Sequence, residues 1–393
     1  MRESIFNIKV SVDGNDYIYN SKNNGIIQIC DEDLYKEENV KYLLEEGYYV
    51  EDGYDEIALL EKEVNKNIKN EKEELSLTVS LTEKCNFECV YCYQDHKAKD
   101  LSIENAEKLV EIVKEMIEDN KFKVLKIHYF GGEPLLNVDM LYYLHDKFKK
   151  ISKEYNMGYK AYLTTNGSRL NKEILSKVNF KNIQLTFDGL EDTHNKLRKS
   201  SMFKFKDTIN LISTILEFCD KVTIRFNICE ENKRDVIPLI DFLMNKFGSN
   251  KINFITARTI KFNEKDKINM ISFKEYSELS LKAEMRLKEH GAKIVLPQRV
   301  KYPCPFTNGN ALSISSDLSL KKCEESEILL EMLSKDSIKK KNEYNVLKSC
   351  RKCRILPLCL GGCYKNRQSG YEGCIPEKNN IEDIIINYIK FES

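Results

Sequence analysis

The chain has 393 residues, of which 41% are hydrophobic and 32% charged, enough for two or three domains with a substantial core. Lys plus Arg and Asp plus Glu balance at 62 each, so charge gives no support to nucleic-acid binding, and we expect no such partner. No run of about 18 apolar residues occurs and residues 1–7 lack an apolar signal segment, so we expect a cytoplasmic protein without a membrane partner.

Residues 1–75 have the pattern of a small α+β unit. Apolar and polar residues alternate on both sides of Asp13-Gly14-Asn15, which predicts a β-hairpin. The expected elements are a hairpin over residues 6–19, a strand over 26–29, a charged helix over 34–44 and a helical connector over 56–74. This unit is too small to carry out chemistry alone.

From residue 76 to 297, apolar strand-like runs alternate with amphipathic helical runs. Strands are expected at residues 77–82, 124–130, 159–164, 183–187, 222–228 and 252–257. Ser102 is a suitable N-cap for the helix after the first strand. Six β–α units in succession predict a parallel sheet with right-handed crossovers.

The residues that look chemical come directly after these strands. They are the loop from Cys85 to Cys92, Gly131-Gly132-Glu133-Pro134, Thr165-Asn166-Gly167 and Asp188-Gly189. A barrel of parallel strands has its active site at this end. Two glycines let the backbone approach a ligand closely, and a carboxylate there could accept from an ammonium group, although an ordinary turn is the alternative.

Thirteen cysteines in a reducing compartment indicate metal binding rather than disulfides. Three lie in residues 81–93 and seven between Cys304 and Cys374, while Cys30, Cys219 and Cys229 are scattered and expected to be buried. The CX3CX2C spacing of the first group suits three corners of an iron–sulfur cube, with one iron left open for a small molecule. A zinc site or three buried thiols is the alternative.

This loop and its position resemble those of the radical S-adenosylmethionine (radical SAM) enzymes. The resemblance implies an α/β fold with an open, partial (β/α)6 TIM-like barrel. It also implies that Cys85, Cys89 and Cys92 bind a [4Fe–4S] cluster and that SAM binds its open iron. The cluster would cleave SAM reductively to a 5′-deoxyadenosyl radical, with an electron from a flavodoxin- or ferredoxin-type donor.

The same resemblance assigns a SAM site. Gly131, Gly132 and Glu133 would grip the methionine amino group, and Arg198 in the Asp-Gly-x4-His-x3-Arg stretch would pair with its carboxylate, unless it is a surface arginine. Thr186 stands where the family usually has Ser. The further candidates are Tyr91, whose backbone would meet the adenine, Asn166, and more weakly Arg225 and Asn227.

Residues 298–393 lose the strand–helix pattern and become rich in cysteine. Their seven cysteines resemble the SPASM domain, whose relatives bind two auxiliary [4Fe–4S] clusters, and two zinc ribbons are the alternative. The resemblance assigns one cluster to Cys350, Cys353, Cys359 and Cys374, and the other to Cys304, Cys323 and Cys363. Asn310 stands where some relatives have an eighth cysteine, and Leu318 where the family prefers glycine.

Glu324 follows Cys323 directly. In SPASM enzymes that oxidise a side chain, an acidic residue here resembles the base that removes a proton after hydrogen abstraction. Glu324 is also one of three carboxylates in Glu-Glu-Ser-Glu, and such a charge run favours a solvated surface, which is the interpretation we prefer from sequence.

These patterns together predict a radical SAM/SPASM enzyme that modifies a peptide or protein. Residues 1–75 resemble the leader-recognition segment of maturases for ribosomally made peptides (RiPPs), which would bind a precursor peptide at a sheet edge. A plain cap on the barrel is the alternative. The expected product is an intrapeptide crosslink, thioether or carbon–carbon. The rivals are an anaerobic sulfatase-maturing enzyme that makes formylglycine and a non-catalytic iron–sulfur electron carrier.

Overall fold

The computed structural model describes residues 1–29, 37–70, 73–96, 98–261, 268–293, 295–307, 310–326, 328–338 and 343–392. Cys30 and the start of the helix expected from residue 34 lie outside these ranges. Among the described residues, no helix is both long and apolar enough to cross a membrane.

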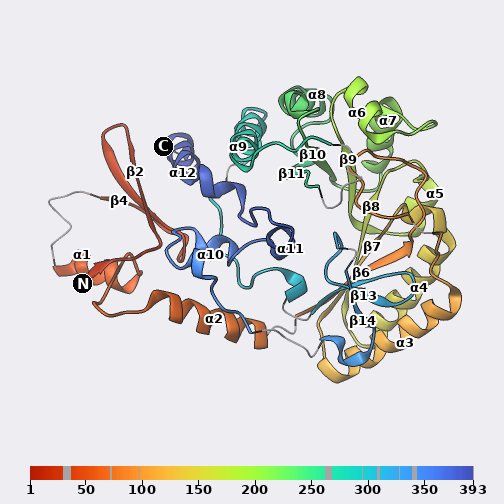
Figure 1. Ribbon diagram of the computed structural model, residues 1–393, viewed down its shortest axis with the longest axis horizontal. Coiled ribbons are helices and arrows are strands. Elements are labelled where there is room, and N and C mark those ends of the chain that lie inside the picture. Colours follow the sequence, from red (N-terminus) through yellow and green to blue (C-terminus); the bar gives the residue numbers. More distant parts are fainter. Residues whose placement is uncertain are drawn as a thin grey trace.

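The central part of the chain is an open barrel of six parallel strands, as the sequence predicts. In chain order and in spatial order the strands are β6 (Glu74–Thr82), β7 (Val124–Gly131), β8 (Gly158–Thr165), β9 (Phe180–Phe187), β10 (Val222–Ile228) and β11 (Ile252–Arg258). Each lies within three residues of its expected bounds. All five neighbouring pairs are parallel, and the helices between them lie along the outer side of the sheet (Figure 1).

The outer helices are α3 (Ile103–Asn120), α4 (Val138–Glu154), α5 (Lys172–Lys177), α6 (Glu191–Arg198), α7 (Phe205–Ile215), α8 (Val236–Phe247) and α9 (Phe273–Glu289). Ser102 caps α3 as expected, because its hydroxyl accepts a hydrogen bond from the Asn105 amide at 3.2 Å. The apolar face of α3, including Leu109 and Val113, is fully buried against the strands. This amphipathic packing fixes the strand ends at one rim of the barrel.

The sheet does not end at β6. β12 (Ala311–Ile314) pairs in parallel with β6, and β13 (Ser319–Lys321) and β14 (Leu329–Met332) follow as antiparallel neighbours, giving nine strands. The sequence showed no strand pattern in this region, so the extension is a correction. Leu318, in the turn before β13, has φ +67 and is buried, which explains why the family prefers glycine there.

The N-terminal unit forms the expected hairpin and helices. β2 (Asn7–Val12), β3 (Asn15–Asn20) and β4 (Ile26–Ile29) make an antiparallel sheet, β1 (Arg2–Glu3) pairs with β5 (Tyr49–Val50), and the helices are α1 (Glu37–Glu45) and α2 (Glu56–Asn70). The remaining helices of the C-terminal part are α10 (Leu356–Cys359), α11 (Tyr364–Gln368) and α12 (Ile381–Glu392).

This N-terminal unit packs on the C-terminal segment. Ile8, Val10 and Val12 of β2 share a buried cluster with Ile385 and other residues of α12. Leu60 and Val64 of α2 lie in another cluster with Val346 and Leu356. Figure 1 shows β2 and β4 beside α12, and α2 running below α10 toward the barrel. The first of these clusters includes Leu281 of α9, so the unit also touches an outer helix of the barrel.

Candidate active site

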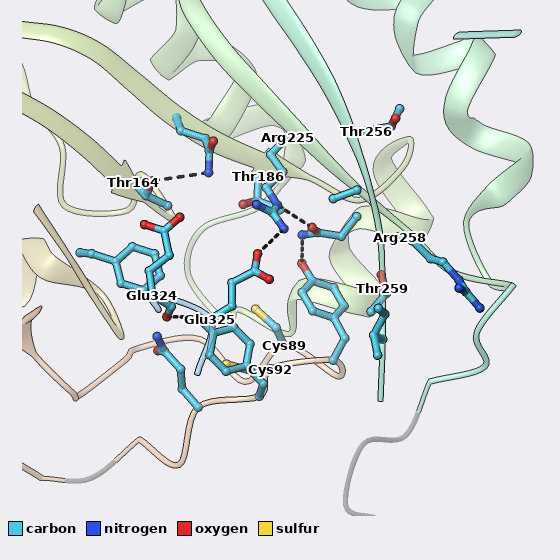
Figure 2. A pocket seen from close by; sticks show the side chains of 18 of the residues that line it. Cys89, Cys92, Thr164, Thr186, Arg225, Thr256, Arg258, Thr259, Glu324 and Glu325 are labelled. Carbon is cyan, nitrogen blue, oxygen red and sulfur yellow. Dashed lines mark hydrogen bonds and ion pairs between the residues drawn. The ribbon is translucent and has the colours of Figure 1, made fainter. Parts of the chain in front are cut away.

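A cavity of about 510 Å³ lies between the barrel interior and the C-terminal segment. Three parts of the chain line it: the cysteine loop after β6, polar residues of β7 to β11, and residues of the C-terminal segment that include Glu324, Glu325, Cys363 and Cys374. Figure 2 shows Glu324 and Glu325 pointing toward the middle of this cavity, near Arg225 and Thr186. Segments far apart in sequence thus meet around one space.

The three cysteines of the CX3CX2C loop all line the cavity. The Cys89 thiol donates to the Arg198 carbonyl at 3.6 Å, and the Asn166 amide nitrogen lies 4.0 Å from the Cys85 sulfur. Burial raises the pKa of Cys85, and it raises that of Cys89 to about 12. Buried thiols of this kind need a positive partner before they ionise, as an iron–sulfur cluster provides.

No group of three or more His, Cys, Asp or Glu side chains within the described ranges converges closely enough for a single metal ion. An iron–sulfur cube takes each thiolate on a different iron atom and so needs a more open arrangement. The donor set of Cys85, Cys89 and Cys92 fits such a cube, with three thiolates and one iron left for another ligand.

Two glycines bring the end of β7 against the cysteine loop. A Cβ on Gly131 would lie 2.1 Å from the Thr82 carbonyl oxygen, and one on Gly132 would lie 2.2 Å from that of Lys84. The Gly132 amide donates to Thr82 at 3.0 Å, and the Glu133 amide donates to Lys84 at 2.8 Å. Only glycine permits this backbone contact, and both glycines line the cavity.

Glu133 lies behind the cavity wall rather than on it. Its carboxylate is fully buried and accepts hydrogen bonds from the Leu135 amide at 3.0 Å, the Thr165 hydroxyl at 2.7 Å and the Asn166 amide at 2.7 Å. Burial raises its pKa above the ordinary value, against these three hydrogen bonds. In this structure the side chain ties the end of β7 to the end of β8, which differs from the direct contact with ligand that the motif suggested.

Asp188, Tyr91 and Arg198 form a buried network beside Cys89. The Tyr91 hydroxyl donates to Asp188 and accepts from the Arg198 guanidinium at 3.0 Å. Arg198 is 8% exposed and lies over the Phe87 ring at 5.3 Å, so the alternative of a surface arginine is wrong. The sequence motif had marked Asp188 and Arg198, and the structure brings them together with Tyr91.

Two atoms of this network lack a partner. Within the described part of the chain, Asp188 Oδ1 and Arg198 Nε are buried without a hydrogen bond, although Arg198 Nε lies 3.8 Å from the other Asp188 oxygen. A buried polar atom without a partner costs about 1–3 kcal/mol, so such atoms indicate a place for a polar ligand group. Arg198 lines the cavity, and its unpaired nitrogen fits a carboxylate such as that of SAM.

Glu324 lies in the cavity and not on a solvated surface, so the surface interpretation preferred from sequence is wrong. Its carboxylate Oε2 lies 3.2 Å from His128 Nδ1 and accepts from the Thr78 hydroxyl at 3.4 Å. Its backbone carbonyl accepts from the Tyr93 hydroxyl at 2.9 Å. Burial raises the pKa of Glu324, but His128 and Arg225 outweigh it and hold the value below the ordinary range.

His128 is a site residue that the sequence reasoning missed. Its Nε2 lies 2.8 Å from the Thr164 hydroxyl, which also accepts from the Gln184 amide at 3.4 Å. The signal in the sequence was weak, because His128 alternates with buried residues of β7 but shares its face with Lys126. Arg225 forms an ion pair with Glu325 at 2.9 Å and donates to Asn227 at 2.9 Å, so these weaker candidates also lie at the cavity (Figure 2).

The seven C-terminal cysteines fall into two groups in space. Arg367 Nη2 lies 4.0 Å from the sulfurs of both Cys350 and Cys374, and burial together with Cys353 and Cys374 raises the pKa of Cys359 to about 11. In the second group, burial raises the pKa of Cys304, and nearby Cys363 adds to this. Thiols gathered in this way have the donor chemistry of iron–sulfur ligands.

Comparison with known proteins gives the class of the chain. Residues 79–243 match the family model of the Radical SAM superfamily. The matched stretch contains the cysteine loop and most of the parallel barrel described above, so this part of the chain is a radical SAM domain.

Curated relatives match over shorter stretches. The Fe-coproporphyrin III synthase of Methanosarcina barkeri is 30% identical over 168 residues, 42% of this chain and 39% of the relative. The GTP 3',8-cyclase of Campylobacter fetus is 31% identical over 180 residues, 43% of this chain and 52% of the relative. The chain therefore spans about half or less of these relatives.

Two solved structures share the fold over more of the chain. Native anSMEcpe with bound AdoMet and Cp18Cys peptide has a TM-score of 0.64 at 19% identity and covers 81% of this chain and 99% of its own. SuiB of Streptococcus suis bound to precursor peptide SuiA has a TM-score of 0.56 at 15% identity and covers 95% and 99%. The second likeness extends over the N-terminal unit as well as the barrel.

Proposed function

We propose that the protein is a radical SAM peptide maturase that forms an intrapeptide crosslink in a ribosomally made precursor. When bound, the cluster would pass one electron to SAM, and the cleavage of SAM would supply the 5′-deoxyadenosyl radical. That radical would take a hydrogen atom from a substrate carbon. The observation that carries this proposal is the single cavity shared by the cysteine loop, the Asp188–Arg198 network and Glu324. The residues proposed to bind the cluster, to bind SAM and to accept a proton all line or adjoin this one cavity.

Residues of the chain have separate tasks in this proposal. Cys85, Cys89 and Cys92 hold the SAM-binding cluster, and Gly132 lines the same cavity, in which SAM would bind. Arg198 orients the carboxylate of SAM through its unpaired nitrogen.

The C-terminal cysteines serve electron transfer in the proposal. Removal of two hydrogen atoms from a peptide leaves one electron to be carried away after the first abstraction. Two auxiliary clusters would accept this electron. One would be held by Cys350, Cys353, Cys359 and Cys374, and the other by Cys304, Cys323 and Cys363. Cys363 and Cys374 line the cavity. Asn310 gives no thiolate to the second set, so the fourth position of that set is either open or held by a ligand other than cysteine. A flavodoxin- or ferredoxin-type protein is the proposed electron donor.

We divide the chain into an N-terminal unit of residues 1–75, a barrel of residues 76–297 and a cluster domain of residues 298–393. The N-terminal unit is the proposed binding site for the leader of the precursor peptide. α12 covers one face of its sheet, and Leu43 of α1 packs near Ile18 on the other. A peptide could therefore join this sheet at an edge, and β4 is an edge strand with half-buried isoleucines. Strand addition gives affinity through backbone hydrogen bonds.

The test is anaerobic co-expression with a short open reading frame that lies beside the gene, followed by accurate mass measurement of the peptide. A crosslink predicts loss of two hydrogen atoms. The loss should disappear with Cys85→Ala and persist with Cys219→Ala, a cysteine outside all three proposed ligand sets. An unmodified peptide with enzyme that still cleaves SAM would refute the crosslinking proposal.

The position of Glu324 supports a second candidate, an anaerobic sulfatase-maturing oxidase. A carboxylate in the cavity beside His128 could take the proton that formylglycine formation releases. The two products differ chemically, because formylglycine carries an aldehyde that a hydrazide probe labels and a crosslink does not. A non-catalytic electron carrier would show neither product and no SAM cleavage.

A further inference from the structure

The outermost strand of the nine-stranded sheet is exposed, and three of its four residues are apolar, the fourth being Glu331. β14 pairs with β13, and within the described part of the chain no strand pairs with its other edge. Leu329, Leu330 and Met332 are 52%, 59% and 57% exposed, and Ile328 before them is 54% exposed. Proteins commonly protect such edges with lysine, proline or a covering element, because an apolar edge strand pairs readily with other chains.

This strand leads directly into the candidate active site. Leu329 pairs with Lys321, which stands two residues before Cys323. The turn between the strands carries Glu324 and Glu325 into the cavity, where Glu325 pairs with Arg225. An extended chain rises about 3.3 Å per residue, so a peptide paired with β14 would reach the level of Glu325 within roughly four residues.

We propose that β14 is a docking edge for the substrate peptide, which adds to it as an extended, apolar strand and is thereby directed into the cavity. This inference rests on the proposed function, in which the substrate is a peptide. It places on β14 the part of that peptide that neighbours the reacting residue. Backbone hydrogen bonds to the β14 edge would provide affinity. Contacts of alternate side chains with Leu329, Leu330 and Met332 would favour apolar residues in the peptide.

A substrate peptide suits this edge better than a second copy of the chain. A stable protein–protein interface needs about 20–30 residues a side, whereas β14 offers four residues. A weak contact is sufficient for a peptide that is already held elsewhere on the same protein. Tethering of that kind raises the effective concentration of the second segment to the millimolar range.

The test uses the full-length protein and a fluorescein-labelled, capped peptide of about ten alternating valine and threonine residues as the probe. Fluorescence anisotropy measures its binding. Leu330→Lys should weaken binding by about tenfold, because it removes an apolar contact and adds a typical edge-protecting charge. Met202→Lys is the matched control, because Met202 is 91% exposed in a loop of the barrel. This variant should bind the probe as the wild type does.

Equal affinity of the wild type and Leu330→Lys, or no binding by the wild type, would overturn the proposal. Thermal unfolding of both variants checks that neither has lost its fold, and Leu329→Lys repeats the test at the next position. Sedimentation velocity tests whether a second copy of the chain occupies the edge instead. A wild-type dimer that becomes a monomer in Leu330→Lys would also overturn the proposal. Formation of 5′-deoxyadenosine is measured separately, so failure of the radical chemistry is distinguishable from failure of the docking edge.

Discussion

The Glu324 carboxylate lies 3.2 Å from the His128 imidazole, although the two residues are 196 positions apart in the chain. His128 stands on β7 inside the barrel, whereas Glu324 belongs to the turn between β13 and β14. The pair therefore exists only because the C-terminal segment closes the open side of the barrel. It joins the inner face of the barrel to the cysteine-rich C-terminal segment.

Replacement of Glu324 should separate SAM cleavage from product formation. We expect Glu324→Gln to lower the yield of modified peptide by about a hundredfold, which is typical for loss of a general base, while 5′-deoxyadenosine still forms. Glu104→Gln, an exposed residue of α3, is the control. Full product yield from Glu324→Gln would show that this carboxylate is dispensable.

Gly132 should tolerate no side chain. A Cβ there would lie 2.2 Å from the Lys84 carbonyl oxygen, so Gly132→Ala must displace the cysteine loop. We expect at least tenfold less SAM cleavage and a stability loss of about 1–3 kcal/mol. Gly158→Ala is matched, because its Cβ would meet Val124 at an ordinary 3.4 Å. Iron content, SAM cleavage and thermal unfolding of both variants check this; unchanged values for Gly132→Ala would contradict it.

Leu318 allows a test of backbone strain. Its left-handed conformation, with φ +67, costs an L-residue about 1–2 kcal/mol, but its side chain is 1% exposed and well packed. Both Leu318→Gly and Leu318→Ala should therefore destabilise the protein, by about 2–5 kcal/mol for the alanine. Glycine should be the more stable of the two by about 1 kcal/mol, the reverse of the usual order in helices. Denaturant unfolding of the two variants decides the order.

His194 should make stability fall in mildly acidic solution. Burial lowers the pKa of its imidazole to about 3, while the unfolded chain titrates near 6.5. Below about pH 6.5 the unfolded state binds the proton and the folded state does not, so stability decreases by about 1.4 kcal/mol per pH unit from this group. Between pH 6.5 and 8 the group has no such effect.

The comparison is between wild type and His194→Gln in urea at pH 8, 6.5 and 5. The variant loses the packing of His194 between Phe187 and Phe205, so it should be less stable at pH 8. The difference from wild type should then narrow by about 2 kcal/mol at pH 5. A constant difference across this range would show that the imidazole is protonated in the folded protein.

The sequence predicted the barrel well because its signals are local. Each strand from β6 to β11 is a short apolar run between helical patterns, and the cysteine loop and Gly131-Gly132 follow strand ends. Asp188 and Arg198 were marked from sequence because both lie within one short motif, whereas their contact with each other appears only in the structure. Local patterns were therefore sufficient to predict which residues lie at the strand ends that form one side of the site.

The C-terminal part was predicted less well because its order depends on distant partners. β12 is four residues long and forms on the edge of β6, more than 200 residues earlier in the chain. Glu324 looks like part of a charged surface until β13 and β14 turn it toward His128. No periodicity in the sequence reports such pairings, since the stabilising hydrogen bonds come from another segment.

The parallel pairing of β12 with β6 makes the barrel and the cysteine-rich segment parts of one sheet. Removal of the chain after residue 297 would leave β6 with an open row of backbone donors and acceptors, so the shortened barrel should aggregate rather than persist as a simpler enzyme. Exchange of this segment with that of a relative would have to keep β12 in register with Ser76 to Val79. The fold of each cysteine region therefore depends on the strand that the other region supplies.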